Sequence, residues 1–206
     1  MPLFTKDSRS IVFVHIPKTA GTSVESHFRA NGWSMSFWSY ARDEGRVASD
    51  QHLLYSELAA RIPGMDEMYS FAIVRHPIKR LISEWRWQRW HQKRFKDTLS
   101  EFVRRVADSL ATDKVYWDNH WRPQSDFLAP GLDRICKLED LERDYPVVIA
   151  ESGAGFDPLL PHENRSKTLF QKYLHWRFKN DLTDEDLKIV SEVYAEDFES
   201  LGYTCE

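Results

Sequence analysis

The chain has little cysteine and no long apolar run, and both scarcities exclude classes of protein. Its two cysteines, Cys136 and Cys205, lie far apart and lack the spacing of a zinc site. So few thiols are typical of a reducing compartment, although one disulfide between them is also compatible with the count. The strongest apolar run, Ile11–Ile16, is too short to cross a bilayer and contains His15. Since a signal-peptide pattern is also lacking, we expect a cytoplasmic protein with no transmembrane segment.

The chain also lacks the positive net charge of a general nucleic-acid binder. Its formal net charge is −4, from 28 Lys and Arg against 32 Asp and Glu, so we expect no nucleic-acid partner. The charge is unevenly spread, with eight bases and one acid from Arg75 to Lys96 and eight acids and one base from Asp181 to Glu199. Such asymmetry either focuses an anionic ligand toward one face or reflects two unrelated solvated helices.

What is present is the composition of one globular domain over 1–206, with 42% hydrophobic and 29% charged residues. The β-branched run 10–16 predicts a buried parallel strand, and the loop and helical pattern after it predict the opening of an α/β nucleotide-binding unit. Other expected strands are 36–40, 68–74 and 134–138. Expected helices begin near Thr22, His52 and Thr183 and cover 78–94 and 99–110.

The loop after the first strand carries the residue types that bind a phosphate or sulfate group. It reads His15-Ile-Pro-Lys-Thr-Ala-Gly-Thr-Ser23. Ala20 and Gly21 let backbone N–H groups approach an anion, and the next helix adds its N-terminal dipole. A positive charge comes from Lys18, and hydroxyl donors come from Thr19, Thr22 and Ser23. The alternative is an ordinary strand-to-helix turn with a hydroxyl N-cap.

This loop is not a Walker A motif. That motif places its Lys directly after a second Gly and before a Ser or Thr that binds magnesium, whereas Lys18 precedes Gly21 by three positions. An ATP-dependent P-loop kinase is therefore disfavoured and is kept as an alternative. A non-catalytic nucleotide-binding module is the other alternative.

The loop resembles the 5'-phosphosulfate loop of the carbohydrate sulfotransferases, especially the heparan and uronyl 2-O-sulfotransferase-like group (sulfotransferase family 2) and its soluble bacterial relatives. The second half of that signature is Arg-x-Pro-x-x-Arg-x-x-Ser, and this chain matches it at Arg75, Pro77, Arg80 and Ser83. The resemblance implies that Arg75 and Ser83 hold the 3'-phosphate of the donor. It also fits the fold class we expect, a P-loop-like three-layer α/β fold with a central, mainly parallel sheet flanked by helices.

The chemistry of Arg75 agrees with this role independently. It stands where the strand 68–74 meets the following helix, and α/β folds bind ligands at the carboxyl ends of their parallel strands. Arginine suits bidentate contact with phosphate. Ser83 lies two turns into the following helix and can face the same crevice.

The resemblance further implies a catalytic histidine between the two motifs, and His52 occupies that place. Histidine is the usual general base near neutral pH. His120 is the rival base, because His120-Trp-Arg-Pro-Gln124 resembles a segment that lines the acceptor side in bacterial relatives. Residues 160–167 resemble the loop over the adenosine end of the donor, with Ser166 and Lys167 as further phosphate contacts.

The implied enzyme transfers a sulfuryl group from 3'-phosphoadenosine-5'-phosphosulfate (PAPS) to a hydroxyl by in-line displacement. It releases 3'-phosphoadenosine-5'-phosphate (PAP) and needs no metal. Lys18 stabilises charge on the bridging oxygen, and the loop amides and hydroxyls hold the spectator oxygens.

The expected acceptor is a hydroxyl of a carbohydrate or glycolipid, and a small metabolite stays open because loops shape acceptor pockets. The tryptophans of 85–90 either stack against sugars or pack in the interior. Golgi relatives carry a membrane anchor before the first motif, whereas here the motif begins at His15. We therefore expect a soluble, bacterial-type enzyme; no pattern in the sequence predicts its oligomeric state.

Overall fold

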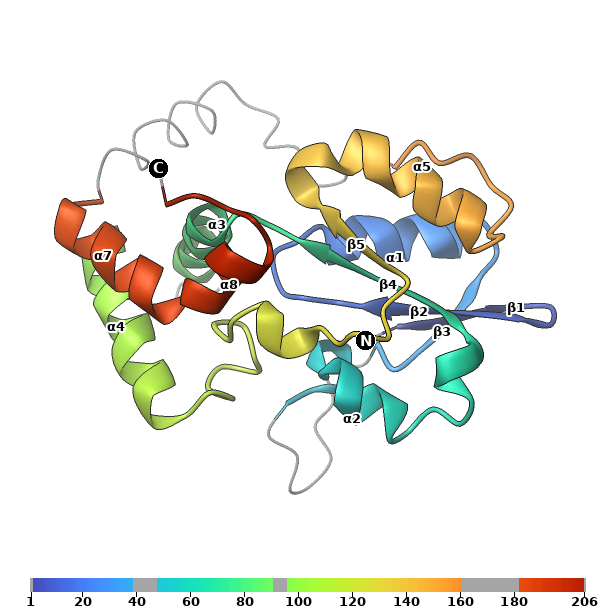
Figure 1. The fold of residues 1–206 in the computed structure, drawn as a ribbon, viewed down its shortest axis with the longest axis horizontal. Helices are drawn as coiled ribbons and strands as arrows, with labels where there is room; N and C mark the ends of the chain where they lie inside the picture. Colours follow the sequence, from blue (N-terminus) through green and yellow to red (C-terminus); the bar gives the residue numbers. More distant parts are fainter. Residues whose placement is uncertain (1, 39–47, 91–95, 161–181, 206) are drawn as a thin grey trace.

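The computed structural model describes residues 2–38, 48–90, 96–160 and 182–205 and shows a mixed α/β fold around a five-stranded sheet (Figure 1). The strand order is β3-β1-β2-β4-β5. The strands are β1 (Leu3–Lys6), β2 (Arg9–Val14), β3 (Ser34–Ser36), β4 (Tyr69–Val74) and β5 (Arg134–Lys137). β2, β4 and β5 pair in parallel, whereas β1 is antiparallel to both β2 and β3. Four strands therefore point the same way, and β1 runs against them.

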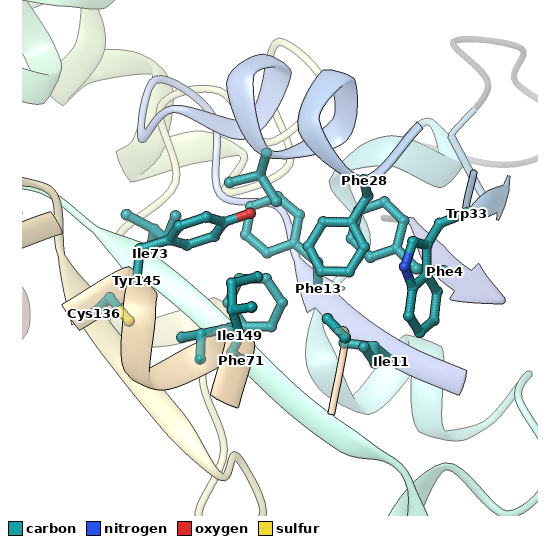
Figure 2. Packing of buried hydrophobic residues seen from close by; sticks show 13 residues of the cluster. Phe4, Ile11, Phe13, Phe28, Trp33, Phe71, Ile73, Cys136, Tyr145 and Ile149 are labelled. Carbon is teal, nitrogen blue, oxygen red and sulfur yellow. The ribbon is translucent and has the colours of Figure 1, made fainter. Parts of the chain in front are cut away.

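Both faces of the sheet are covered, which explains why β2 and β4 are continuous apolar runs. Because side chains alternate along a strand, Phe13 and Phe71 point toward α1 (Gly21–Ala30) and α5 (Leu141–Glu151). Figure 2 shows these rings packed with Phe28 of α1 and Tyr145 of α5. Val14 and its neighbours on the opposite face pack against α2 (Tyr55–Ala59).

The other helices form a cluster at the carboxyl end of the parallel strands (Figure 1). They are α3 (Pro77–Trp90), α4 (Leu99–Thr112), α7 (Asp184–Val193) and α8 (Ala195–Ser200). Trp85, Phe102 and Val190 are buried among them. In the part of the chain that the structure describes, no helix is long and apolar enough to cross a membrane.

Helix α8 holds the segment around Gln124 in place through hydrogen bonds to Asp197. The Asp197 carboxylate of α8 is fully buried and accepts hydrogen bonds from the backbone N–H groups of Gln124 and Ser125, at 2.9 and 2.8 Å. The Gln124 side chain in turn donates to the Arg75 carbonyl and accepts from the Arg75 N–H, both at 2.8 Å. Residues 120–125 are thereby fixed to the end of β4.

Most expected elements are confirmed, with shifted ends. The strand expected at 36–40 is wrong at Phe37 and Trp38: β3 shares only Ser36 with it, because Phe37 takes a φ of 56°. Residues 39 and 40 lie outside the described ones, as do 91–94 of the helix expected at 78–94. His52 does not open a helix: it ends the 3-10 turn η1 (Asp50–His52), because Leu53 and Leu54 are extended. The helix capped by Thr183 breaks at Tyr194, and β1 and α5 were not expected.

Candidate active site

The loop between β2 and α1, residues 17–23, has an unusual backbone. Lys18 and Ala20 have φ angles of 70° and 76°, in the left-handed region. Residues other than glycine adopt this region only where the surroundings fix it. Thr19 is fully buried beneath the loop, and its Oγ1 donates a hydrogen bond to the Ile16 carbonyl at 2.8 Å. The Thr19 hydroxyl hydrogen is therefore used to close the loop.

Helix α1 begins from this loop without a side-chain cap, because its N-cap residue is Ala20. The alanine side chain has no oxygen that could cap the first turn, although the Ala20 carbonyl accepts from the Ser23 N–H at 3.0 Å. An anion can therefore take the role of the missing cap, and the helix dipole favours it. Thr22 is exposed and Ser23 is buried in this first turn. Neither hydroxyl residue occupies the N-cap position. The loop therefore differs from the alternative of an ordinary turn with a hydroxyl N-cap.

Gly21 is required by a neighbouring side chain. A Cβ atom at this position would overlap the His15 imidazole. That ring is held by Glu25 of α1, since its Nδ1 lies 2.6 Å from Glu25 Oε1. Burial alone would raise the pKa of Glu25, but the hydrogen bonds with His15 and Gln51 and the His15 charge together outweigh burial and lower it. Gly21 therefore has a packing role in addition to the role predicted from the sequence, which is to let backbone N–H groups approach an anion.

Two arginines of the second motif tie β4 and α3 to the loop. Arg75 follows β4, and its Nη1 donates to the Lys18 carbonyl at 3.3 Å. Arg80 is buried and donates from Nε to the Pro17 carbonyl at 3.0 Å and from Nη2 to the His120 carbonyl at 2.9 Å. Burial is the main cause that lowers the pKa of Arg75. A guanidinium that has lost water in this way gains most when an anion binds beside it.

Helix α3 turns one face toward the loop. The Lys18 Nζ lies 5.0 Å from the centroid of the Trp87 ring, a cation–π distance. Arg80, on the same helix, contacts the loop as described. Ser83 follows Arg80 by three positions and precedes Trp87 by four, so helical spacing puts it on this face. It is half-buried there.

Burial and two neighbouring charges shift the pKa of Lys18 in opposite directions. Burial lowers its pKa, the negative charge of Glu84 raises it, and the positive charge of Arg75 lowers it further. Glu84 is the single acid in the basic run of the sequence, and it is buried at the centre of this face of α3. The pKa of Lys18 therefore depends first on its burial, and then on the charges of Glu84 and Arg75.

Beyond Trp87 lie two imidazole–carboxylate pairs, which we call the base cluster: His52, Asp118, His120 and Glu84. His52 Nδ1 lies 2.9 Å from Asp118 Oδ2, and His120 Nδ1 lies 3.0 Å from Glu84 Oε2. The two imidazoles meet edge to face with centroids 4.7 Å apart. Trp87 stacks on His120 at 5.2 Å. The cluster is thus continuous with Lys18 through a single tryptophan.

Of the tryptophans expected either to stack on sugars or to pack inside, Trp85 and Trp87 have side chains that the structure describes. Trp85 is buried in the helical cluster, whereas Trp87 is half-buried beside Lys18 and His120.

Burial lowers the pKa of His52, and the neighbouring His120 and His15 charges lower it too, although the Asp118 hydrogen bond opposes them. Burial would raise the pKa of Asp118, but its hydrogen bonds with His52 and Ser49 outweigh burial and lower it. At neutral pH the pair is therefore a neutral imidazole beside a carboxylate. This is the protonation state that a general base needs.

His52, Asp118 and His120 each offer one metal-ligating atom, and these atoms lie within 4.8 Å of one another. The hydrogen bonds already described engage Asp118 with His52 and His120 with Glu84. They account for the arrangement as a proton-handling group, and we assign no metal to it.

The structure brings most of the expected site residues into one region. They are Lys18, Thr19, Ala20, Gly21, Thr22, Ser23, His52, Arg75, Ser83 and His120. Ser166 and Lys167 lie outside the described residues. Sequence reasoning missed Asp118 and Glu84. The isolation of Glu84 among eight bases was a usable signal, whereas Asp118 meets His52 across 66 residues of chain and gave none.

Comparison with known proteins agrees with the resemblance. No curated protein and no solved structure gives a significant match. The family model described as Sulfotransferase family (sulfotransferase family 2) matches residues 1–204, nearly the whole chain. This protein therefore belongs to the sulfotransferase family.

Proposed function

We propose that this chain transfers a sulfuryl group from PAPS to an acceptor hydroxyl by in-line displacement, with His52 as the general base. One observation carries the proposal. An uncapped helix N-terminus with Lys18, a desolvated Arg75 and a buried neutral His52 come from three distant segments and meet at the carboxyl end of β2 and β4. A cationic half and a proton-accepting half are what this reaction requires.

The donor site proposed here uses the cationic half. The first N–H groups of α1 and the hydroxyls of Thr22 and Ser23 would hold the sulfate end, and Arg75 and Ser83 would hold the 3'-phosphate. The residues present fit such a ligand, because nothing in the Ala20 side chain can satisfy those N–H groups. When bound, the donor supplies the sulfuryl group and leaves as PAP.

The proposed catalytic roles follow from charge. Lys18 would donate to the bridging oxygen, where negative charge grows as the S–O bond breaks. His52 would take the acceptor proton at Nε2, since its Nδ1 is engaged by Asp118. His120 stays the rival base, because Glu84 engages it in the same manner. No metal is needed in this scheme, since Lys18 and the helix N-terminus supply the positive charge.

We also propose a carbohydrate or glycolipid as the bearer of the hydroxyl. Tyr116 is 38% exposed, and it packs near Trp117 and Trp121, with ring centroids at 6.3 and 4.9 Å. This aromatic group directly precedes and follows Asp118 and His120 in the chain. Tyr116 is the exposed ring of this group, since Trp121 is buried, and aromatic side chains with a few polar groups typically line ligand pockets.

The sheet supports the finer fold class of a P-loop-like, three-layer arrangement. α1 and α5 cover one face and α2 covers the other. The 17–23 loop connects a central parallel strand to a helix, as a phosphate-binding loop does.

Labelled sulfuryl transfer tests the proposed function. Purified protein is incubated with PAPS, a chelator and a panel of oligosaccharides, glycolipids and small alcohols, in parallel with magnesium-ATP. Metal-independent labelling of a hydroxyl acceptor is the expected result. Phosphoryl transfer from magnesium-ATP alone would favour the kinase. Binding of PAP with no transfer to any acceptor would favour the non-catalytic module.

A further inference from the structure

The turn that leads into His120 has a strained backbone. Trp117, Asp118 and Asn119 have φ angles of 58°, 58° and 61°. Asp and Asn adopt this left-handed region with some ease, but a bulky residue such as Trp seldom does. Three such residues in succession persist only where other contacts hold them. Strain of this kind is often found at functional sites.

Asp118 and Asn119 of this turn hydrogen-bond to Ser49 and His52. Asp118 Oδ1 accepts from the Ser49 N–H at 2.5 Å, and Oδ2 accepts from the Ser49 hydroxyl at 2.9 Å. Oδ2 also lies 2.9 Å from His52 Nδ1. The next residue, Asn119, donates from Nδ2 to the His52 carbonyl at 2.9 Å. The turn therefore hydrogen-bonds to both the ring and the backbone of His52.

These contacts determine where the His52 ring carries its proton. An ionised carboxylate is only an acceptor, and Asp118 already accepts two hydrogen bonds from Ser49. Nδ1 of a neutral His52 must then carry the hydrogen, and Nε2 must carry the lone pair. His52 is 3% exposed, so bulk water cannot replace Asp118 as the partner of Nδ1.

We propose that Asp118 is a positioning residue that fixes His52 in the Nδ1–H tautomer, so that Nε2 is the atom that accepts the proton of the acceptor hydroxyl. In the step, the hydroxyl O–H bond breaks and the Nε2–H bond forms. The hydroxyl oxygen bonds to sulfur, and the bond from sulfur to the PAP oxygen breaks. Asp118 stabilises the imidazolium that results. The inference rests on the proposed function and adds a residue that no sequence motif indicated.

The Glu84–His120 pair supplies an internal comparison. It has the same Nδ1-to-carboxylate geometry, but Glu84 also accepts from Gln88 Nε2 at 2.5 Å and interacts with the Lys18 charge. Asp118, in contrast, is hydrogen-bonded to Ser49 and His52. The two carboxylates can therefore be neutralised separately.

Asp118→Asn tests the inference with little change of shape. Because the single oxygen of the amide is needed by the Ser49 N–H, its NH₂ group turns to His52 and favours the Nε2–H tautomer. We expect kcat to fall about 10²- to 10⁴-fold, as when a catalytic histidine is held in the wrong tautomer. The KM for PAPS and the affinity for PAP should stay within about twofold. Asp126→Asn is the matched control, since Asp126 pairs with Arg122 and not with His52, and its kcat should be unchanged.

Tautomers are read directly from ¹⁵N chemical shifts of the histidine ring. The wild-type protein should show His52 protonated at Nδ1, and Asp118→Asn should move the proton to Nε2. An Nε2–H tautomer in the folded wild type would overturn the inference without any substitution, which covers the case in which Asp118→Asn fails to fold. Wild-type kcat in a folded Asp118→Asn protein would overturn it too.

Failure of the proposed function would look different. In that case the wild type would neither bind PAP nor transfer sulfuryl groups to any acceptor, while the ¹⁵N spectra would still report on the His52 tautomer. An inactive wild type would thereby overturn the catalytic role of the tautomer, and an active one with an indifferent Asp118 would overturn the inference alone.

Discussion

The two halves of the site differ in charge: the donor half is positive, whereas the base half consists of imidazole–carboxylate pairs. The donor half combines Lys18 and Arg75, which are both partly desolvated, with the positive N-terminal end of α1, which has no side-chain cap. In the base half, each imidazole is matched by a buried or half-buried carboxylate. A positive surface gains by binding an anion, whereas charge-matched pairs gain little from it and are suited to moving a proton. Binding and turnover should therefore be separable by mutation.

The largest effect that follows from this difference is expected at the base half. His52→Ala removes the proton acceptor and should lower kcat about 10²- to 10⁴-fold with little change in PAP affinity. His120→Ala is the sharper comparison, because both rings share the cluster. Steady-state kinetics and calorimetry on the two variants provide the measurement. A larger loss of kcat in His120→Ala than in His52→Ala would exchange their roles.

The next effect is expected at the junction of the two halves. Lys18→Ala should lower kcat roughly 10²- to 10³-fold, because its charge is needed mainly in the transition state. Affinity for PAP should fall much less. Lys6→Ala, an exposed lysine that bonds the Asn31 carbonyl, should leave both quantities unchanged. Single-turnover rates and calorimetric affinities measure the two separately. Equal, small changes in both would contradict the role of Lys18 in the transition state.

The smallest effect is expected on stability. Gly21→Ala puts a Cβ against the His15 ring, and overpacking of this kind typically destabilises by about 1–3 kcal/mol. For a chain of this length the Tm should drop by about 2–4 °C per kcal/mol. In a His15→Ala background the same change should destabilise less, since the two sites are in contact. Thermal unfolding of the four proteins completes the cycle, and additivity would contradict the packing role of Gly21.

The two halves also differ in how far they could be predicted from the sequence. The donor half is local: the 17–23 loop follows β2 directly, and Arg75 to Ser83 follow β4 directly. A strand, a loop and a helix in succession can be recognised from a short stretch of sequence. The strands β2 and β4 could be predicted for the same reason, since both are short apolar runs.

The base half depends on contacts between distant residues. Asp118 and His52 are 66 positions apart, and Glu84 and His120 are 36 apart. No local pattern encodes such pairs, so the resemblance to the sulfotransferases indicated His52 and His120 but not their partners. Helix α5 was missed because Pro146 interrupts its pattern. The dependence of Gly21 on His15 also needed the three-dimensional structure.

Calorimetric titration with PAP, without metal and in parallel with magnesium-ATP, tests the central claim most directly. The wild type should bind PAP tightly in the presence of a chelator. Arg75→Ala should weaken that binding roughly 10- to 100-fold, as expected for a lost charge-assisted contact. Arg134→Ala, a change of an arginine that pairs with Glu151 at the end of α5, should bind as the wild type does. Binding of magnesium-ATP alone, indifferent to Arg75, would contradict the account.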